Sequence, residues 1–139
     1  MQLNISSDYT IRIILYLAIT NETTTSKSVS EAMGIPLRYT LKLMRELEKN
    51  NFLKSFTGVK GGYCLKRTPD KISLFDILSI SEPTMKINRC LESDEYCSRE
   101  GVGSCKVHNF YSNFQKELEE KLSNVSIQSL MERSHIDCQ

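Results

Sequence analysis

Three of the five cysteines and one of the two histidines lie in the stretch from Arg89 to His108. This stretch has almost no apolar pattern, so packing in a core is a poor explanation for Cys90, Cys97 and Cys105. A helix would place Cys105 and His108, three residues apart, on one face. Thiolates combined with an imidazole favour zinc or an iron–sulfur centre and disfavour calcium or magnesium. We therefore interpret the four residues as metal ligands.

The chain could use these cysteines for zinc, for disulfides or for an iron–sulfur cluster. Structural zinc sites usually contain cysteines about two to four residues apart, whereas the gaps here hold six and seven residues. Disulfides need an oxidising compartment, and the N-terminal residues do not resemble a secretory signal, because the apolar run Ile11–Ile19 follows Asp8 and contains Arg12. That run is also too short to span a bilayer. We expect a cytoplasmic chain without a membrane partner, with reduced thiols and an iron–sulfur cluster.

Charge is distributed unevenly along the chain. Residues 1–72 contain 11 Lys and Arg against 6 Asp and Glu, a net +5, and residues 73–139 contain 7 against 11, a net −4. The basic half is where a nucleic acid would bind. No acid, base and nucleophile occur together in a recognisable catalytic motif, and His135 near the C-terminus is an unsuitable catalyst. The sequence therefore predicts a binding protein and not an enzyme.

The basic half begins with three predicted helices. Apolar periodicity and capping residues place them at Tyr9–Thr20, Ser26–Met33 and about Pro36–Asn50. Gly34 ends the second helix, and Pro36 suits the first turn of the third. Two helices joined by so short a turn resemble a helix-turn-helix.

The third helix has one cationic and one apolar face. At about 100° per residue, Arg38, Lys42, Arg45 and Lys49 fall in one narrow sector, opposite Thr40, Leu43, Met44 and Leu47. The alternative is a solvated face paired with Glu46 and Glu48, but both acids lie off the basic stripe. A basic second helix is the element that enters the major groove. The residues expected to contact double-stranded DNA are Arg38, Tyr39, Lys42, Arg45 and Lys60.

A hairpin follows this helix. Two short strands, Phe52–Thr57 and Tyr63–Arg67, flank the glycine-rich tip at residues 58–62, which carries Lys60. The glycines match neither the spacing nor the following helix of a phosphate-binding loop. We expect a wing, with Cys64 in its second strand acting as a small packing residue.

The acidic half contains the cysteines and a long helix. Ser73 and Asp76 form a capping-box pattern at the start of a helix over 74–80, and a long amphipathic helix is predicted over 106–124. Its apolar stripe predicts a homodimer, and a short helix from Ser126 to Glu132 follows, with Cys138 in the tail as a bystander. The stripe comprises Val107, Phe110, Tyr111, Phe114, Leu118 and Leu122. We expect a mainly α fold with a small β wing: a winged helix-turn-helix domain at 1–80, a cysteine-bearing loop at 81–106, and a dimerisation helix plus short helix at 107–139.

Taken in this order, the motifs resemble the Rrf family of bacterial winged-helix regulators, most closely its IscR-type and NsrR-type iron–sulfur members. The matching stretches are Asp8-Tyr9, residues 30–35 before the third helix, Gly61-Gly62-Tyr63 in the wing, and the four candidate ligands. The chain departs from the family at Thr57, where many members carry arginine, and at Leu41, where IscR-type members carry an acid.

The resemblance implies a homodimeric transcription factor that binds a partly palindromic operator and holds one two-iron or four-iron cluster per subunit. Cluster loss, oxidation or nitrosylation would then alter DNA affinity. His108 matches the fourth ligand of IscR-type members, and Asp8 matches that of NsrR-type members, where it comes from the partner subunit. We favour His108 because it lies close to Cys105 in the chain. The alternatives are a cluster-free regulator that uses the cysteines as a thiol switch or zinc site, and an electron carrier, which would not need a wing.

Overall fold

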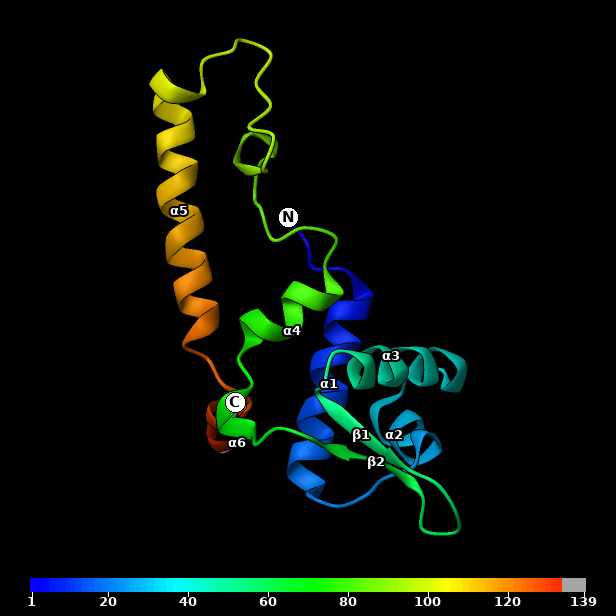
Figure 1. Cartoon of the computed structure of the whole chain (residues 1–139). Coiled ribbons are helices and arrows are strands. Elements are labelled where there is room, and N and C mark those ends of the chain that lie inside the picture. Colours follow the sequence, from blue (N-terminus) through cyan, green and yellow to red (C-terminus); the bar gives the residue numbers. More distant parts are fainter. Residues whose placement is uncertain (134–139) are drawn as a thin grey trace.

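The computed structural model describes residues 1–133 and has the predicted mainly helical architecture with a small wing (Figure 1). Helices α1, α2, α3, the hairpin and α4 form the body, from which α5 extends as an arm. The cysteine-bearing segment crosses from α4 to the far end of α5, with short 3-10 turns at Arg89–Leu91 and Val102–Ser104. The elements are α1 Ile5–Thr20, α2 Ser26–Met33, α3 Leu37–Lys49, β1 Leu53–Phe56, β2 Gly62–Leu65, α4 Leu74–Ser81, α5 Lys106–Ser123 and α6 Ile127–Arg133.

The core lies in the body and draws on nearly every element there. Ile13 and Ile14 of α1 are fully buried, together with Met44 of α3. Ile127, at the start of α6, is also fully buried in this cluster. After α5 the chain therefore returns to the winged-helix body, where the N–H of Ile127 donates to the carbonyl of Ile72 at 2.9 Å.

Helix α1 begins four residues earlier than the sequence predicts. Asn4 is the N-cap, and its Oδ1 accepts from the N–H of Ser7 at 2.9 Å. Glu82, which follows α4, holds this end of α1 by accepting from the N–H of Asn4 at 2.9 Å and from the hydroxyl of Ser7 at 2.5 Å. The predicted start at Tyr9 is wrong because Asn4 caps the helix and the distant carboxylate of Glu82 holds its first turn.

The turn between α2 and α3 is built as the sequence predicts. Gly34 adopts φ +64° at the C-cap of α2, a left-handed conformation that favours glycine. The next residue, Ile35, is buried, and its N–H donates to the carbonyl of Ser30 at 3.1 Å. Pro36 then precedes α3. The tight turn fixes α3 against α2 and leaves the basic face of α3 outward.

The wing is a two-stranded antiparallel hairpin with Leu53 opposite Leu65 and Phe56 opposite Gly62. Both strands are shorter than predicted. The α1–α2 loop pairs with the hairpin. The N–H of Thr24 donates to the carbonyl of Tyr63, and the N–H of Tyr63 donates to the carbonyl of Thr24, each at 2.8 Å. A Cβ at Gly62 would lie 2.7 Å from the carbonyl oxygen of Thr24, so only glycine permits this approach.

Helix α4 begins with the predicted capping box. The Ser73 hydroxyl accepts from the N–H of Asp76 at 3.1 Å, and the carboxylate of Asp76 accepts from the N–H of Ser73 at 2.9 Å. In the described part of the chain, no helix is both long enough and apolar enough to cross a membrane.

Candidate functional site

The basic residues of α3 share one surface. Arg38, Lys42 and Arg45 are exposed and line a shallow groove of about 990 Å³, together with Tyr39 and residues of α1. Among residues 1–133 none of these three cations forms an ion pair. Pairing with Glu46 or Glu48, which would have marked a solvated face, is therefore not found. Three unpaired cations in one groove are suited to binding an anionic polymer.

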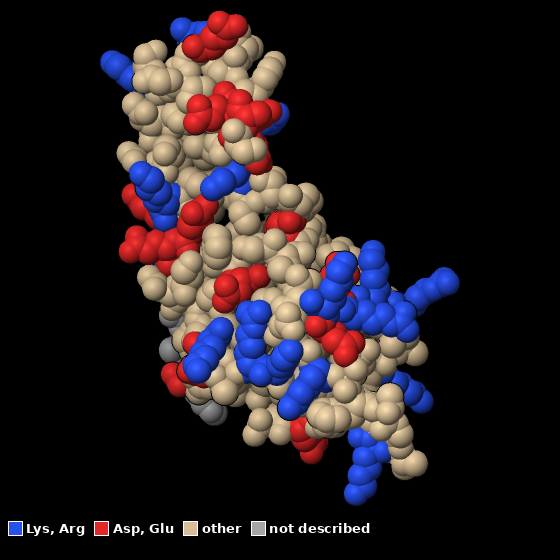
Figure 2. All heavy atoms as spheres, in the orientation of Figure 1, with Lys and Arg blue, Asp and Glu red and all other residues tan. Residues whose placement is uncertain are grey.

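Charge is segregated between the two parts of the molecule (Figure 2). Lys and Arg side chains gather over the winged-helix body, and Asp and Glu side chains are prominent on the arm formed by α5 and the cysteine segment. This arrangement matches the sequence count of +5 for residues 1–72 and −4 for residues 73–139. A polyanion would be attracted to the body and repelled by the arm.

Tyr39 connects the groove to α1. Its ring packs edge-on against Tyr9 with the centroids 5.6 Å apart, and its hydroxyl hydrogen-bonds to the hydroxyl of Ser6. The ammonium of Lys42 lies 5.9 Å from the centre of the Tyr39 ring. Tyr39 is half-buried, so it orients Lys42 and ties α3 to α1 as well as lining the groove.

Lys60 lies at the wing tip and not in the groove. The tip is closed by the N–H of Gly61, which donates to the carbonyl of Gly58 at 3.0 Å, and Gly58 has φ +96°. Lys60 is exposed there, and its neighbour Val59 is fully exposed. The wing therefore presents a second cationic point, separate from α3.

The four predicted ligands of the cysteine segment line one hollow of about 300 Å³. Cys105 is the N-cap of α5, and its Sγ accepts from the N–H of His108 at 3.4 Å. The Sγ of Cys90 lies 3.3 Å from Nδ1 of His108, on the first turn of α5. Cys90 and His108 are thus in contact although a long loop separates them in the chain.

Cys97 lies in a nest of backbone N–H groups. Hydrogen bonds from the backbone of Gly101, and next from that of Arg99, lower the pKa of its thiol below the ordinary value. Arg89, next to Cys90, pairs with Asp94 and lies 5.5 Å from the centre of the Tyr96 ring. These contacts hold the loop between the first two cysteines, and Arg89 lowers the pKa of the Asp94 carboxyl.

The donor groups do not converge further within the part of the chain that the structure describes. No three Cys, His, Asp or Glu side chains there approach closely enough to hold a metal ion. Asp8 does not line the cysteine hollow, and its carboxylate pairs with Arg12 at 2.5 Å. Cys64 is half-buried in β2, away from this hollow, and Cys138 and His135 lie outside the described residues.

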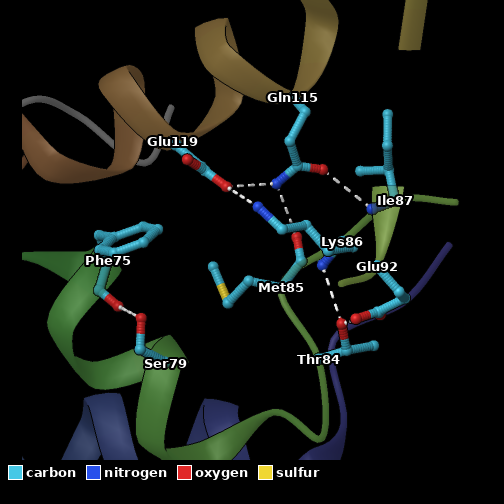
Figure 3. A network of polar contacts seen from close by, with 9 residues as sticks. All are labelled: Phe75, Ser79, Thr84, Met85, Lys86, Ile87, Glu92, Gln115 and Glu119. Atoms are coloured by element: carbon cyan, nitrogen blue, oxygen red, sulfur yellow. Dashed lines mark hydrogen bonds and ion pairs between the residues drawn. The ribbon is translucent and has the colours of Figure 1, made fainter. Parts of the chain in front are cut away.

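Sequence reasoning missed one polar network at the base of the cysteine segment (Figure 3). Gln115 of α5 is buried and bonds to the backbone of Met85 and Ile87, and Lys86 pairs with Glu119 at 2.9 Å. The available signal was a polar side chain seven residues after His108, on the same side of the helix.

Comparison with known proteins identifies the family. The sequence model of Rrf2, described as an iron-dependent transcriptional regulator, matches residues 3–133. The chain belongs to the Rrf2 family. This Rrf2 protein is 26% identical over 138 residues to the transcriptional regulator IscR of Klebsiella pneumoniae (strain 342), covering 98% of this chain and 83% of the relative.

Solved structures show the same fold as this Rrf2 chain. T. potens IscR superposes with a TM-score of 0.76 at 21% identity, covering 100% of this chain and 93% of that one. CymR of B. subtilis, titled the global cysteine regulator, gives 0.75 at 24% identity, covering 99% of both chains. The Rrf2 protein is a transcriptional regulator with a winged helix and not an enzyme, as its sequence predicts. Regulators of this family bind DNA and are typically dimeric.

Proposed function

We propose that this Rrf2 protein is a homodimeric repressor or activator whose affinity for a partly palindromic operator responds to an iron–sulfur cluster held by its cysteine segment. The observation that supports the proposal is the contact of 3.3 Å between Sγ of Cys90 and Nδ1 of His108, beside Cys105. Three thiols and an imidazole that line one hollow are a donor set suited to iron.

Cys90, Cys97, Cys105 and His108 would hold the cluster. When bound, the cluster would supply a centre whose charge and integrity respond to iron–sulfur supply, redox state or nitric oxide. Closing the hollow requires both Cys97 and Cys105 to approach Cys90 and His108, because no three donors converge in the described residues. The segment between Cys90 and Cys105 would therefore become more ordered when the site is filled.

DNA binding would use the groove of α3 and the wing. Arg38, Lys42 and Arg45 would contact phosphates and base edges of the major groove, and Lys60 would contact the flanking backbone. In a dimer the two α3 helices must match half-sites about 34 to 36 Å apart, or a multiple of that spacing. Since α5 carries an exposed apolar stripe that includes Phe110 at 63% exposure, we take α5 as the dimer contact.

The first test is cluster retention by cysteine variants after anaerobic purification. Cys90→Ala, Cys97→Ala and Cys105→Ala should each lose most of the visible absorption and the bound iron and sulfide, because each thiolate is a ligand. Cys64→Ala and Cys138→Ala are the matched controls and should retain both. Equal loss in all five variants, or a colourless active parent protein, would contradict the proposal.

The fourth ligand is tested by comparing two variants. His108→Ala should shift the visible spectrum and the reduction potential, because the imidazole of His108 lies against Cys90 in the same chain. Asp8→Ala should leave both unchanged, since the Asp8 carboxylate is paired with Arg12 and does not line the hollow. If only Asp8→Ala perturbs the cluster, the ligand comes from the partner's first helix and the histidine assignment is wrong.

A second candidate function is a thiol switch without a cluster. The backbone N–H groups around Cys97 favour its thiolate, which is the reactive form of cysteine. Cys97 and Cys105 also line a second, adjacent hollow of about 320 Å³. Under this alternative the metal-free chain should change its DNA affinity on mild oxidation and recover with a reductant, and a Cys97→Ser variant should not respond.

A further inference from the structure

Gln115 makes an unusual set of contacts for a residue in the middle of a long helix. It is the buried residue of α5, with 4% exposure, and both ends of its amide are used. Its Oε1 accepts from the N–H of Ile87 at 2.9 Å, while Nε2 donates to the carbonyl of Met85 at 2.9 Å and to the carboxylate of Glu119 at 2.8 Å (Figure 3). The side chain therefore has no unused polar group.

The partners of Gln115 are backbone groups of residues 85–87, a stretch outside the helices that leads to the 3-10 turn Arg89–Leu91. In extended chain the carbonyl of one residue and the N–H two residues later lie on the same edge, where a neighbouring strand would pair with them. The Gln115 amide takes the place of that strand and pairs with Met85 and Ile87. Because it bonds to the backbone, it fixes where this segment lies along α5, whatever side chains the segment carries.

The position of this contact sets the position of Cys90. His108 precedes Gln115 by seven residues, close to two helical turns, so the two lie on nearly the same side of α5 about 10 Å apart along the axis. Ile87 precedes Cys90 by three residues, and the chain between them passes through extended Asn88 into the 3-10 turn Arg89–Leu91, which carries Cys90. With Ile87 held at Gln115, Cys90 arrives at His108, where Sγ and Nδ1 are 3.3 Å apart.

A change of register would separate the two donor groups. A slip of one residue moves the segment by roughly 3.3 Å along α5 and turns successive side chains to the opposite side. Lys86 pairs with Glu119 at 2.9 Å, but both side chains are about one-third exposed, so this ion pair resists a slip only weakly. The hydrogen bonds from Gln115 to the backbone of Met85 and Ile87 are therefore the contacts that select one register over the next.

We infer that Gln115 is a positioning residue that sets the register of the Met85–Cys90 segment against α5 and thereby presents Cys90 to His108. An apolar residue of similar volume would fill the same space but would leave the N–H of Ile87 and the carbonyl of Met85 without partners. The consequence for cluster binding rests on the proposed function. The register itself is a property of the metal-free chain and is tested there.

The experiment compares Gln115→Met with Lys116→Met, a control at the next, exposed position of α5. In the reduced, metal-free chain, loss of the hydrogen bonds should speed amide exchange at Ile87 by roughly tenfold. Alkylation of Cys90, followed by mass spectrometry, should rise by about the same factor because both report the same local opening. Alkylation of Cys64 in the wing should not change, and serves as an internal reference for the fold of the body.

A second variant distinguishes loss of these hydrogen bonds from unfolding of the arm. Gln115→Asn keeps the amide on a stem one methylene shorter, so it should lose the contacts to Met85 and Ile87 while α5 keeps its helical circular dichroism. Unchanged exchange at Ile87 and unchanged alkylation of Cys90 in both variants would overturn the inference. Equal acceleration in the Lys116→Met control would also overturn it, because the effect would then belong to α5 in general.

Measuring cluster content of the same variants separates this inference from the proposed function. If the parent chain holds a cluster and Gln115→Met loses it faster while Lys116→Met does not, both stand. A parent chain that never holds a cluster, together with the expected changes at Ile87 and Cys90, refutes the proposed function and leaves the register role intact. A parent chain that holds a cluster, with no change at Ile87 or Cys90 in Gln115→Met, refutes the register role alone.

Discussion

Removing cations from the groove of α3 should change the salt dependence of DNA binding by a calculable amount. Each phosphate contact contributes about 0.9 to the slope of log affinity against log salt concentration. Lys42 and Arg45 are exposed in one groove without ion pairs among residues 1–133, so each is free to contact a phosphate. In a dimer every substitution acts twice. Arg45→Ala should therefore lower the slope by about 1.8, and Lys42→Ala plus Arg45→Ala by about 3.6.

The assay is fluorescence anisotropy with a labelled duplex of arbitrary sequence, because phosphate contacts do not depend on the operator. A slope change of about 1.8 means that a fourfold change in salt alters the affinity of Arg45→Ala roughly tenfold less than that of the parent. Lys116→Ala removes the same charge from α5, outside the groove, and should leave the slope within error of the parent value.

Two results would refute this reasoning. An unchanged slope for Lys42→Ala and Arg45→Ala would show that α3 does not face the phosphates. An equal decrease for Lys116→Ala would show that overall charge, and not the groove, governs binding. If the chain holds the proposed cluster, its visible spectrum should be the same in all of these variants, because none of the substituted residues lines the cysteine hollow.

Three further predictions concern single residues. Alkylation of Cys97 should persist to lower pH than that of an unstructured cysteine peptide, because its lowered pKa keeps the thiolate present as pH falls; an equal pH profile would contradict the nest of N–H groups. Glu82→Ala should destabilise the chain by about 2 to 3 kcal/mol in urea unfolding, because two donors of α1 lose a charged acceptor, and Glu82→Gln, which keeps an acceptor, should lose clearly less. Gly62→Ala should cost more than about 1 kcal/mol, because its Cβ would lie 2.7 Å from the carbonyl oxygen of Thr24, whereas Gly103→Ala, with open space around it, should be nearly neutral. Similar unfolding midpoints for the two glycine variants would show that the wing shifts to accommodate the added Cβ.

Features encoded by neighbouring residues could be predicted from the sequence. The Ser73–Asp76 capping box and the left-handed Gly34 depend on contacts within a few residues, and both are found. The cationic face of α3 follows from helical periodicity alone, and Arg38, Lys42 and Arg45 share one groove, although Lys49 does not line it. The grouping of Cys90, Cys97, Cys105 and His108 was predicted from donor chemistry and spacing, and these four residues line one hollow, although no three of them converge.

Features that depend on distant residues could not be predicted in the same way. The first turn of α1 is also held by Glu82, which is 78 residues from Asn4, and no local pattern marks that contact. Gln115 bonds to the backbone of Met85 and Ile87, which are 30 and 28 residues away, and backbone partners leave no trace in side-chain identity. The register of the cysteine segment against α5 therefore could not be predicted from the sequence pattern, although the donor residues could.

The same distant contacts join the cysteine segment to the DNA-binding surface. Glu82 immediately precedes the segment that leads to Cys90, and it holds the first turn of α1. Two residues after Ser7, Tyr9 packs against Tyr39 of α3, whose ring lies beside Lys42. The segment is thus fixed to α5 at one end by Gln115 and to α1 at the other by Glu82. A displacement of this segment along α5 would be coupled to α3 through Glu82 and Tyr9 only if both sites bias the same two arrangements of α1.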